Sequence, residues 1–450
     1  MKHLIALSLS AALLITPQAS LAQSDKDAAL IAKAHKIHDR VITLDTHNDI
    51  EPSNFTADCN YSMRLTTQVN IPKMIQGGMD VSFMIVYVGQ GPLTPEGYDD
   101  AYKQAIAKFD AIHRLTEQIA PDKIGLALTP EDVIRLHKAG KKIAVIGVEN
   151  GYPIGLDVKR VKEFYDRGAR YMSLAHNGNS QLADSNTGEK DGYSYNNGLS
   201  DEGRQVIAEM NRLGIMVDLS HPAKGANLEA IRLSKAPVIA SHSAIRALAP
   251  SVSRDMDDEQ LEALKKNGGV IQVVGFSSYL KPESPERAAA LTKLQKEFFG
   301  DLARRGARGE SAPRSCPVES ATDAKSARRG GMAAYANMLP EDKRADFLKQ
   351  MAEIDAKYPP APRANVGDLI DHVDYAVKKI GIDHVGLASD FDGGGGIDGW
   401  NSTDQSFNVT LELVRRGYSE EQIGKLWSGN LLRVWGEVDK VAKQLQKAQK

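Results

Sequence analysis

Two residues that commonly bind metal ions, His47 and Asp49, stand one residue apart shortly after an apolar run at residues 41–44. Such a run is typical of a buried strand. Because alternate residues of an extended chain point to the same side, the imidazole and the carboxylate would enter the same space. Neutral imidazole and carboxylate are preferred ligands of zinc and related ions. For either residue alone, a capping Asp or a hydrogen-bonded core His would be the simpler interpretation.

Residues of the same types follow three later apolar runs, namely Glu149, His221 and His242. A carboxylate at the end of a buried run is costly to bury unpaired, so Glu149 requires a metal ion or a salt bridge. Its two oxygens could bridge two ions about 3.5–4 Å apart, the separation found in two-metal hydrolases. Each His alone could be an ordinary core residue. Together with His47 and Asp49, these residues place potential ligands after four predicted strands, which indicates a shared metal site.

His176 and Asp390 follow two further apolar runs. His176 could be a sixth ligand, or it could polarise a substrate carbonyl by donating a hydrogen bond. Asp390 beside metal-bound water could take a proton from the water and return it to a leaving group, whereas a helix cap or a partner for Arg is the alternative. The glycines at residues 393–396 could cradle a phosphate. A flexible loop is favoured there, because no Lys-Ser/Thr follows.

The other histidines beyond the N-terminal segment lack this placement after a strand. His384 precedes the last predicted strand, at the end away from the site. The rest fall in predicted helices and are expected to be ordinary surface residues. They are His35, His38, His113, His137 and His372.

Eight short apolar runs, separated by amphipathic stretches, would position these side chains. Alternating strands and helices predict an α/β protein with a parallel sheet. Because the candidate ligands gather after the strands, a (β/α)8 TIM-type barrel is favoured. A doubly wound open sheet is the alternative, but no G-x-G-x-x-G follows the first run. The predicted strands are residues 41–44, 81–88, 143–148, 171–174, 215–218, 238–241, 270–274 and 385–388.

A long insertion, residues 277–366, separates the seventh predicted strand from the eighth. Residues 285–305 and 340–357 have helical spacing, whereas the Arg-, Ser-, Ala- and Gly-rich middle at residues 305–331 is predicted to be a surface loop. No domain linker interrupts the chain, so one domain is expected.

The chain has two cysteines, Cys59 after the first predicted strand and Cys316 after the seventh. Both loops would emerge on the catalytic face of a barrel. A disulfide between them would hold the insertion over the site and, in the loop-entropy model, stabilise the fold by roughly 4–5 kcal/mol. Two unrelated thiols are the alternative.

Charge and composition exclude several other classes of protein. The chain has 56 basic and 58 acidic residues, with no basic stripe, so neither nucleic acid nor a membrane surface is indicated as a partner. A hydrophobic content of 42% suits a globular enzyme. No C-x-x-C, H-E-x-x-H or G-x-S-x-G motif is present, which disfavours a structural zinc site, a zincin and a serine hydrolase.

Residues 1–22 are predicted to be a cleavable signal peptide. They combine a short basic start, an apolar stretch at residues 4–15 and small residues before the expected cleavage after Ala22. The apolar stretch is too short to span a membrane. Residues 23–450 are therefore expected to form one exported barrel domain in the periplasm, without a membrane anchor in the mature chain.

Taken together, these motifs resemble the membrane (renal-type) dipeptidases of the amidohydrolase superfamily, as a bacterial exported member. The resemblance extends from about His38 to Trp435, with the motifs in family order, but the insertion has no clear counterpart. The matching segments are residues 44–49, 147–151, 174–177, 218–221, 241–244, 253–254, 389–393 and 429–434.

The resemblance implies two zinc ions per chain and a role for each candidate residue. Glu149 would bridge the two ions. The expected ligands of one zinc are His47 and Asp49, and those of the other are His221 and His242. For the substrate, His176 would contact the scissile carbonyl, Arg254 would bind the terminal carboxylate and Asp390 would shuttle the proton. For Arg254, a surface Arg beside Asp257 and Asp258 is the alternative.

The expected function is therefore zinc-dependent hydrolysis of dipeptides, including those with a C-terminal D-residue, by a bridging hydroxide. Residues 149–152 read Glu-Asn-Gly-Tyr, whereas some relatives have Glu-Gly-Gly-His, so contacts around the bridging carboxylate should differ. Another amidohydrolase reaction, such as N-acyl-D-amino acid deacetylation or lactone opening, is one alternative. A metal-dependent binding protein without turnover is another. The binding partner would be a small dipeptide. The sequence does not decide whether the protein forms a homodimer.

Overall fold

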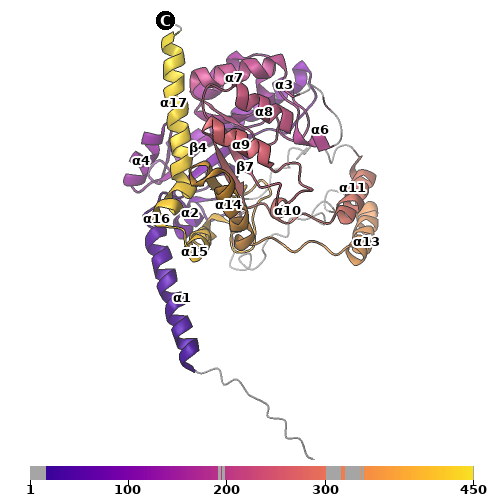
Figure 1. Cartoon of the computed structure of the whole chain (residues 1–450). Coiled ribbons are helices and arrows are strands. Elements are labelled where there is room, and N and C mark those ends of the chain that lie inside the picture. The colour runs from indigo at the N-terminus through magenta and orange to yellow at the C-terminus, as the bar shows by residue number, and fades with distance from the viewer. Residues whose placement is uncertain are drawn as a thin grey trace, which may run out of the picture.

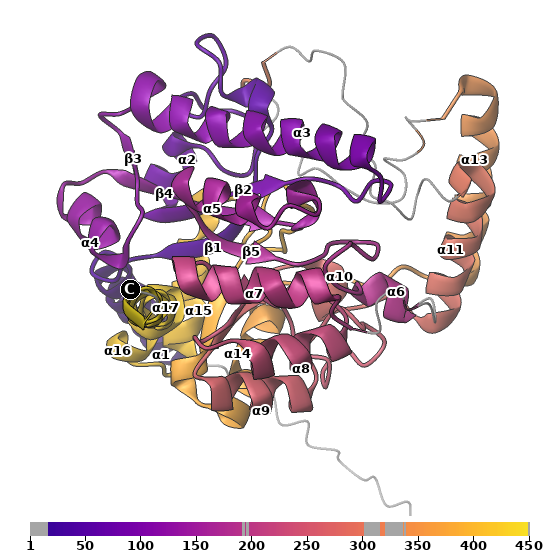
Figure 2. The same ribbon diagram turned by 90° about the horizontal axis from the view of Figure 1, so that it is seen from above.

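The computed structural model describes residues 17–190, 194, 198–300, 316–319, 336 and 339–448, with side chains from residue 27 onward except those of residues 189–190. The strands pair in parallel in the order β1-β2-β4-β5-β6-β7-β8-β9, and β3 pairs beside β4. The sheet curls until β1 meets the chain after β9, where the Asp49 amide donates to the Phe391 carbonyl over 2.9 Å. This confirms the predicted (β/α)8 barrel, with helices around the strands (Figures 1 and 2). The strands are β1 (Leu44–Asp49), β2 (Val81–Tyr87), β3 (Ile124–Leu126), β4 (Lys142–Glu149), β5 (Ala169–Ser173), β6 (Met216–Asp218), β7 (Ile239–Ser243), β8 (Val270–Val274) and β9 (Val385–Ala388).

Seven of the predicted strands overlap β2 and β4 to β9, but the first was placed wrongly. It was predicted at residues 41–44, whereas β1 is Leu44–Asp49, so His47 and Asp49 lie within the strand. Its polar residues are buried and satisfied by hydrogen bonds, for example from Asn48 Nδ2 to Asp45 Oδ2 over 2.9 Å. Apolar periodicity cannot detect such a strand. The three-residue strand β3 was missed because it is too short to show a pattern.

The strands are buried on both faces, which explains why most of them are continuous apolar runs. Inside the cylinder, Val81, Phe83 and Ile239 belong to one apolar cluster. Trp435 of the C-terminal helix joins this cluster beside residues at the starts of the strands. That helix therefore covers the N-terminal end of the barrel and leaves the C-terminal ends of the strands to the loops.

Many of the helices begin at a polar cap. Thr94, Thr129, Ser200 and Asn365 each accept a hydrogen bond from a backbone amide of the first turn that follows. The helices outside the insertion are α1 (Pro17–His38), α2 (Ile71–Gly77), α3 (Pro95–Arg114), α4 (Pro130–Lys138), α5 (Lys159–Asp166), α6 (Asn186–Lys190), α7 (Asp201–Leu213), α8 (Lys224–Leu233), α9 (Asp258–Asn267), α14 (Val366–Ile380), α15 (Phe407–Arg415), α16 (Glu420–Gly424) and α17 (Asn430–Ala448).

The insertion between β8 and β9 contains α10 (Ser277–Leu280), α11 (Pro285–Phe299) and α13 (Glu341–Lys357). Helices α11 and α13 lie side by side and stand apart from the helices that surround the barrel (Figure 2). They share a small core of their own that includes Leu294 and Phe347. Of the predicted loop at residues 305–331, only residues 316–319 are among those described.

A disulfide joins Cys59 to Cys316, with their Cα atoms 5.4 Å apart. The structure thus decides between the two alternatives that the sequence left open, in favour of a bridge, which ties the insertion to the loop after β1. Backbone hydrogen bonds reinforce it, since the Thr66 amide donates to the Pro317 carbonyl over 2.7 Å and the Glu319 amide donates to the Arg64 carbonyl over 3.0 Å.

Residues 1–16 of the predicted signal peptide lie outside the described residues. Helix α1 begins at Pro17 and continues through the expected cleavage position after Ala22 (Figure 1). Within the part of the chain that is described, no helix has both the length and the apolar character needed to cross a membrane.

Candidate metal centre

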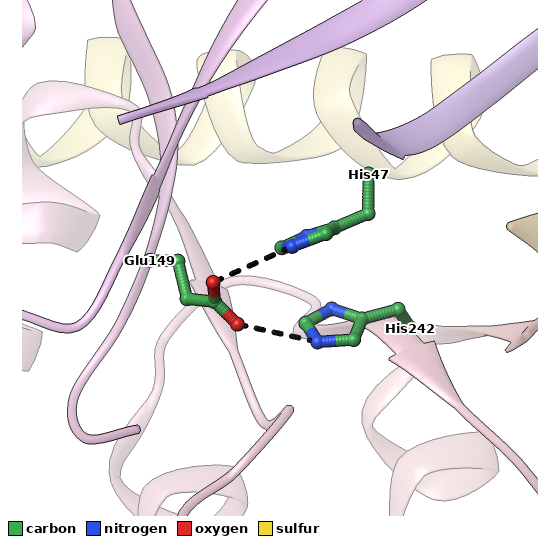
Figure 3. Close-up of side chains that lie close together, drawn as sticks. All are labelled: His47, Glu149 and His242. Carbon is green, nitrogen blue, oxygen red and sulfur yellow. Dashed lines mark ion pairs between the residues drawn. The ribbon is translucent and has the colours of Figure 1, made fainter. Parts of the chain in front are cut away.

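Glu149, the last residue of β4, lies at the centre of a ring of imidazoles and is almost completely buried. Its Oε1 atom lies 2.9 Å from His221 Nε2 and 3.3 Å from His242 Nε2. Its Oε2 atom lies 3.5 Å from His47 Nε2. Figure 3 shows His47 and His242 facing different oxygens of this one carboxylate. A carboxylate arranged in this way can bridge two cations.

The candidate ligands form three overlapping groups, each with its donor atoms within 4.8 Å of one another. Glu149 belongs to two of these groups and His47 to two. The structure thus brings together all five residues expected to bind metal, and it adds His176 and Asp390 to them. The groups are His47, Glu149 and His242; Glu149, His176 and His221; and His47, Asp49 and Asp390.

The orientation of His47 is set by Tyr171, which projects from β5. The Tyr171 hydroxyl donates its only proton to the Thr46 carbonyl over 3.0 Å. Its oxygen therefore accepts from His47 Nδ1–H, 2.9 Å away. When His47 is neutral, this contact leaves its lone pair on Nε2, an atom that is buried without a hydrogen-bond partner. Metal-binding imidazoles are commonly oriented in this way by an acceptor at the other nitrogen.

His242 is oriented by a different pair of residues. The Ser241 hydroxyl donates to Asp218 Oδ2 over 2.7 Å. Its oxygen is therefore free to accept from His242 Nδ1–H, 2.8 Å away. The lone pair of His242 then lies on Nε2, facing Glu149 and 3.0 Å from the Nε2 atom of His221. Two imidazole nitrogens and a carboxylate oxygen converge there, as the ligands of a zinc ion would.

Backbone strain concentrates at this centre. Among the described residues, four non-glycine residues have a positive φ, and all four follow strands at the site. Such conformations cost about 1–3 kcal/mol each and persist where the surrounding structure enforces them, which is common at functional sites. The residues are Asn150 (φ 74), His221 (φ 82), Asp390 (φ 58) and Asp392 (φ 61).

The electrostatics of the centre fit a cation. Burial opposes ionisation of Glu149, but the imidazoles of His47 and His176 hold its pKa well below the usual range. Burial also lowers the pKa of His47, but Glu149, Asp390 and Asp49 outweigh this effect and raise the pKa to about 9. A proton on His47 therefore compensates for a surplus of carboxylates, and a metal ion would do the same.

His221 and His242 respond in the opposite way. Burial lowers the pKa of both imidazoles well below the ordinary value, and the charge of Arg254 adds to the effect. They are therefore neutral near pH 7, which is the form that binds metal ions. The donor set of neutral imidazoles and carboxylates suits zinc.

Arg254 is buried beside the centre. Its Nη2 atom donates to the His242 carbonyl over 2.7 Å, and its guanidinium lies 5.6 Å from the centre of the Tyr279 ring. The alternative of a surface Arg paired with Asp257 or Asp258 is wrong. Asp257 instead pairs with Lys224 at 2.6 Å.

His176 and Asp390 complete the rim of the centre. His176 Nε2 lies 3.8 Å from Glu149 Oε1, and its ring lies 4.6 Å from that of Tyr87. Asp390 Oδ1 lies 4.0 Å from His47 Nε2. Burial raises the pKa of Asp390 well above its usual range, against the attraction of His47, and the neighbouring Asp49 and Glu149 raise it further. A carboxyl group with a raised pKa accepts a proton more readily than an ordinary carboxylate.

Several residues around the centre were not singled out by sequence reasoning. Tyr171 and Asp218 lie inside predicted strands, so strand alternation could have marked them as inward-facing. Ser241 directly precedes His242, at the end of another predicted strand. Tyr279 lies in the insertion, where no pattern pointed to the site. Burial raises the pKa of Tyr279 to about 12, with Asp390 among the nearby charges.

The fold and the centre together define a barrel with a cluster of candidate metal ligands around one carboxylate, at the C-terminal ends of its strands. The model of the membrane dipeptidase family (peptidase family M19) matches residues 31–449. The chain belongs to this family.

Relatives with named activities agree with this membership. The chain is 28% identical to Dipeptidase tcpJ of Claviceps purpurea, over 84% of this chain and 71% of that protein. It is also 28% identical to Dipeptidase ataJ of Aspergillus terreus, over 92% and 88% of the two chains.

Among solved structures, the probable dipeptidase PvdM of Pseudomonas aeruginosa is similar with a TM-score of 0.74 and 32% identity, over 92% of this chain and all of that one. A metallopeptidase of Rhodobacter sphaeroides, liganded with a phosphinate mimic of the dipeptide L-Ala-D-Ala, shares the fold with a TM-score of 0.62 and 21% identity, over 88% and 99% of the two chains.

Proposed function

We propose that this protein hydrolyses the amide bond of dipeptides with the help of two zinc ions. The observation that carries the proposal is the placement of Glu149, whose two carboxylate oxygens face imidazoles on opposite sides. One ion would be held by His47 and Asp49, the other by His221 and His242, with Glu149 shared. Bound zinc would supply a Lewis acid that polarises the scissile carbonyl and lowers the pKa of the attacking water.

The chain's own residues would bind and orient the dipeptide. The Arg254 guanidinium is a planar fork that matches a carboxylate, so it would hold the C-terminal carboxylate of the substrate. Arg254 is buried beside His242, so a carboxylate bound to it would lie next to the metal centre. A fixed terminal carboxylate leaves room for a single residue beyond the scissile bond, so longer peptides would be poor substrates.

Two residues would manage hydrogen bonds and protons during the reaction. His176 would donate a hydrogen bond to the scissile carbonyl and stabilise the charge that develops there. Asp390 would accept the proton of the attacking water and deliver it to the departing amine. Its raised pKa favours acceptance of the proton from that water.

We further propose that the substrates include dipeptides with a C-terminal D-residue, encountered in the periplasm after cleavage of a signal peptide at residues 1–22. The L-Ala-D-Ala mimic bound by the fold-related metallopeptidase supports this choice of substrate. In the periplasm, dipeptides derived from peptidoglycan would be substrates of this kind.

The decisive experiment combines metal analysis with a substrate panel. The purified protein should carry two equivalents of zinc and hydrolyse L,L- and L,D-dipeptides, with loss of activity after chelation and recovery with zinc. The panel should include N-acetyl-D-amino acids, a lactone and tripeptides. Turnover of N-acetyl-amino acids with inert dipeptides would replace the proposal with a deacetylase, and metal binding without any turnover would replace it with a binding protein.

A further inference from the structure

The loop that follows β9 carries Asp390 and has an unusual backbone. Both Asp390 and Asp392 have positive φ, and the amides of Gly393 and Gly395 donate to the Asp390 carbonyl over 3.2 and 2.8 Å. A Cβ atom added to Gly393 would lie 2.1 Å from Asp390 Oδ1 and 2.5 Å from Asp49 Oδ2. The glycine run is therefore a tight turn wrapped around two carboxylates, rather than the flexible loop that was favoured. Residues 389–401 are called the Asp390 loop below.

The Asp390 loop is held from outside by Gln68, in the long loop after β1. The Asp392 amide donates to Gln68 Oε1 over 2.7 Å. In return, Gln68 Nε2 donates to the carbonyls of Gly395 and Asn401 over 3.0 and 2.8 Å. The one acceptor and both donors of the Gln68 amide are thus used on three points of the loop, an arrangement that no other side chain of this size reproduces.

The backbone of Gln68 holds the same region. Its amide donates to Asp392 Oδ1 over 3.0 Å, and the neighbouring Val69 amide donates to Asp392 Oδ2 over 3.2 Å. Its carbonyl accepts from the Thr403 amide over 3.0 Å, just beyond the loop. Because a strained conformation persists only where its surroundings enforce it, these contacts explain how the loop is maintained.

The segment that carries Gln68 is itself anchored to the insertion. Arg64 Nε donates to Glu319 Oε2 and Arg64 Nη2 donates to Asp404 Oδ2, both over 3.0 Å. The Cys59–Cys316 disulfide fixes the same strip of the insertion a few residues away. Gln68 therefore extends from a rigid support towards the loop, and it is part of neither the metal-ligand set nor the substrate contacts.

We propose that Gln68 is a positioning residue, which holds the Asp390 loop so that the Asp390 carboxylate points at the reacting atoms. This inference rests on the proposed function, because it takes its purpose from the proton transfer by Asp390. A displacement of about 1 Å in a catalytic group can cost about a hundredfold in rate. Loss of the Gln68 hydrogen bonds should therefore lower kcat more than it alters KM.

The test replaces the amide without creating a cavity. Gln68→Met keeps the length of the side chain and removes its hydrogen bonds, and Gln68→Glu keeps one acceptor but turns a carboxylate oxygen towards two carbonyls. Both variants should lower kcat for L-Ala-D-Ala by about tenfold to a hundredfold, with KM within about threefold and the zinc content unchanged. The matched control is Gln260→Met, because Gln260 is a buried Gln of α9 whose side-chain oxygen accepts from Asn227 Nδ2 over 3.1 Å rather than from the Asp390 loop. It should leave kcat unaltered.

Hydrogen–deuterium exchange provides a readout that needs no turnover. In Gln68→Met, amides of residues 389–401 should exchange faster, while those of β2 and β4 keep their protection. A kcat within twofold of the wild-type value would overturn the inference, and so would unchanged exchange in the loop. If the wild-type protein cleaved no dipeptide, the proposed function would fail. Faster exchange confined to residues 389–401 in Gln68→Met would still show that Gln68 holds the Asp390 loop.

Discussion

The two sides of Glu149 contain the same kinds of residue in different proportions. One side combines the single imidazole of His47 with the carboxylates of Asp49 and Asp390. The other side contains three imidazoles and the nearby guanidinium of Arg254. The pKa of His47 is raised to about 9, whereas those of His221 and His242 are lowered well below the ordinary value. His47, His221 and His242 are all buried, so burial does not explain why their pKa values shift in opposite directions.

The contrast shows that the charge of the neighbours decides the state of a buried histidine. Beside carboxylates, a proton on His47 is stabilised, and a metal ion must displace it. Beside other imidazoles and an arginine, His221 and His242 stay neutral and offer lone pairs at once. Metal binding near pH 8 should therefore displace a proton from His47, whereas His221 and His242 have no proton to displace from the nitrogens that bind metal.

The largest effect is expected from the residue that the two sides share. Glu149→Gln preserves the shape of the side chain but removes the negative charge that both sides require. Both equivalents of zinc should be lost on dialysis, and kcat/KM should fall by at least about 10⁴-fold, since a two-metal site stabilises several kcal/mol of developing charge. Metal content and dipeptide kinetics measured on one preparation provide the check. Retention of one equivalent would show that Glu149 serves one side alone.

Asp390→Asn tests whether the two carboxylates of the first side have different tasks. A general acid–base group contributes about 10²–10⁴-fold, so kcat should fall by that factor while two zinc equivalents remain bound. Asp49→Asn is the matched comparison, and it should weaken metal binding. If Asp390→Asn also lost zinc, Asp390 would be a metal ligand. Its proximity to His47 and Asp49 would then reflect metal binding rather than proton transfer. Full activity would remove its assigned role.

Much of this arrangement was predictable because strand ends are visible in the sequence. In a parallel barrel, residues that follow apolar runs must meet at one rim, so Glu149, His176 and Asp390 could be brought together without coordinates. The support of these residues could not be predicted. Tyr171 contacts His47 and Gln68 contacts Asp392 across separations of 124 and 324 residues, and neither contact leaves a local pattern.

Histidines in helices show the same limit. His38 and His372 were expected at the surface, and both are wrong, because each is buried. His38 Nδ1 lies 2.7 Å from Thr410 Oγ1, and His372 Nδ1 accepts from the Ile245 amide over 3.1 Å. Helical periodicity identifies an apolar stripe but does not tell which polar residue at its edge meets a partner from a distant element.

The orienting contacts of the two sides can be removed separately. Tyr171→Phe removes the hydroxyl that accepts a hydrogen bond from His47 Nδ1, with little change in side-chain volume. Ser241→Ala does the same for His242 Nδ1. Loss of such an orienting partner typically weakens metal binding by about 10–100-fold. Titration with a chelator should therefore release one zinc early from each variant and leave the second at its wild-type affinity. Equal weakening of both ions in either variant would show that the sides are not independent.

His372 provides a reference for burial without neighbouring ligands, and it carries the smallest predicted effect. Burial lowers its pKa to about 4, against the opposing effects of a hydrogen bond with the Leu280 backbone and attraction from Asp371 and Asp368. The unfolded chain, with a pKa near 6.5, binds more protons between these values, so the free energy of unfolding should decrease as the pH falls. The loss should reach about 2 kcal/mol between pH 7.5 and pH 5. His372→Asn keeps an acceptor for the Ile245 amide and does not titrate, so denaturant unfolding of this variant at the two pH values should lack this component. An identical pH dependence in both proteins would mean that His372 titrates normally, and burial would then be too weak to explain the low pKa of His221 and His242.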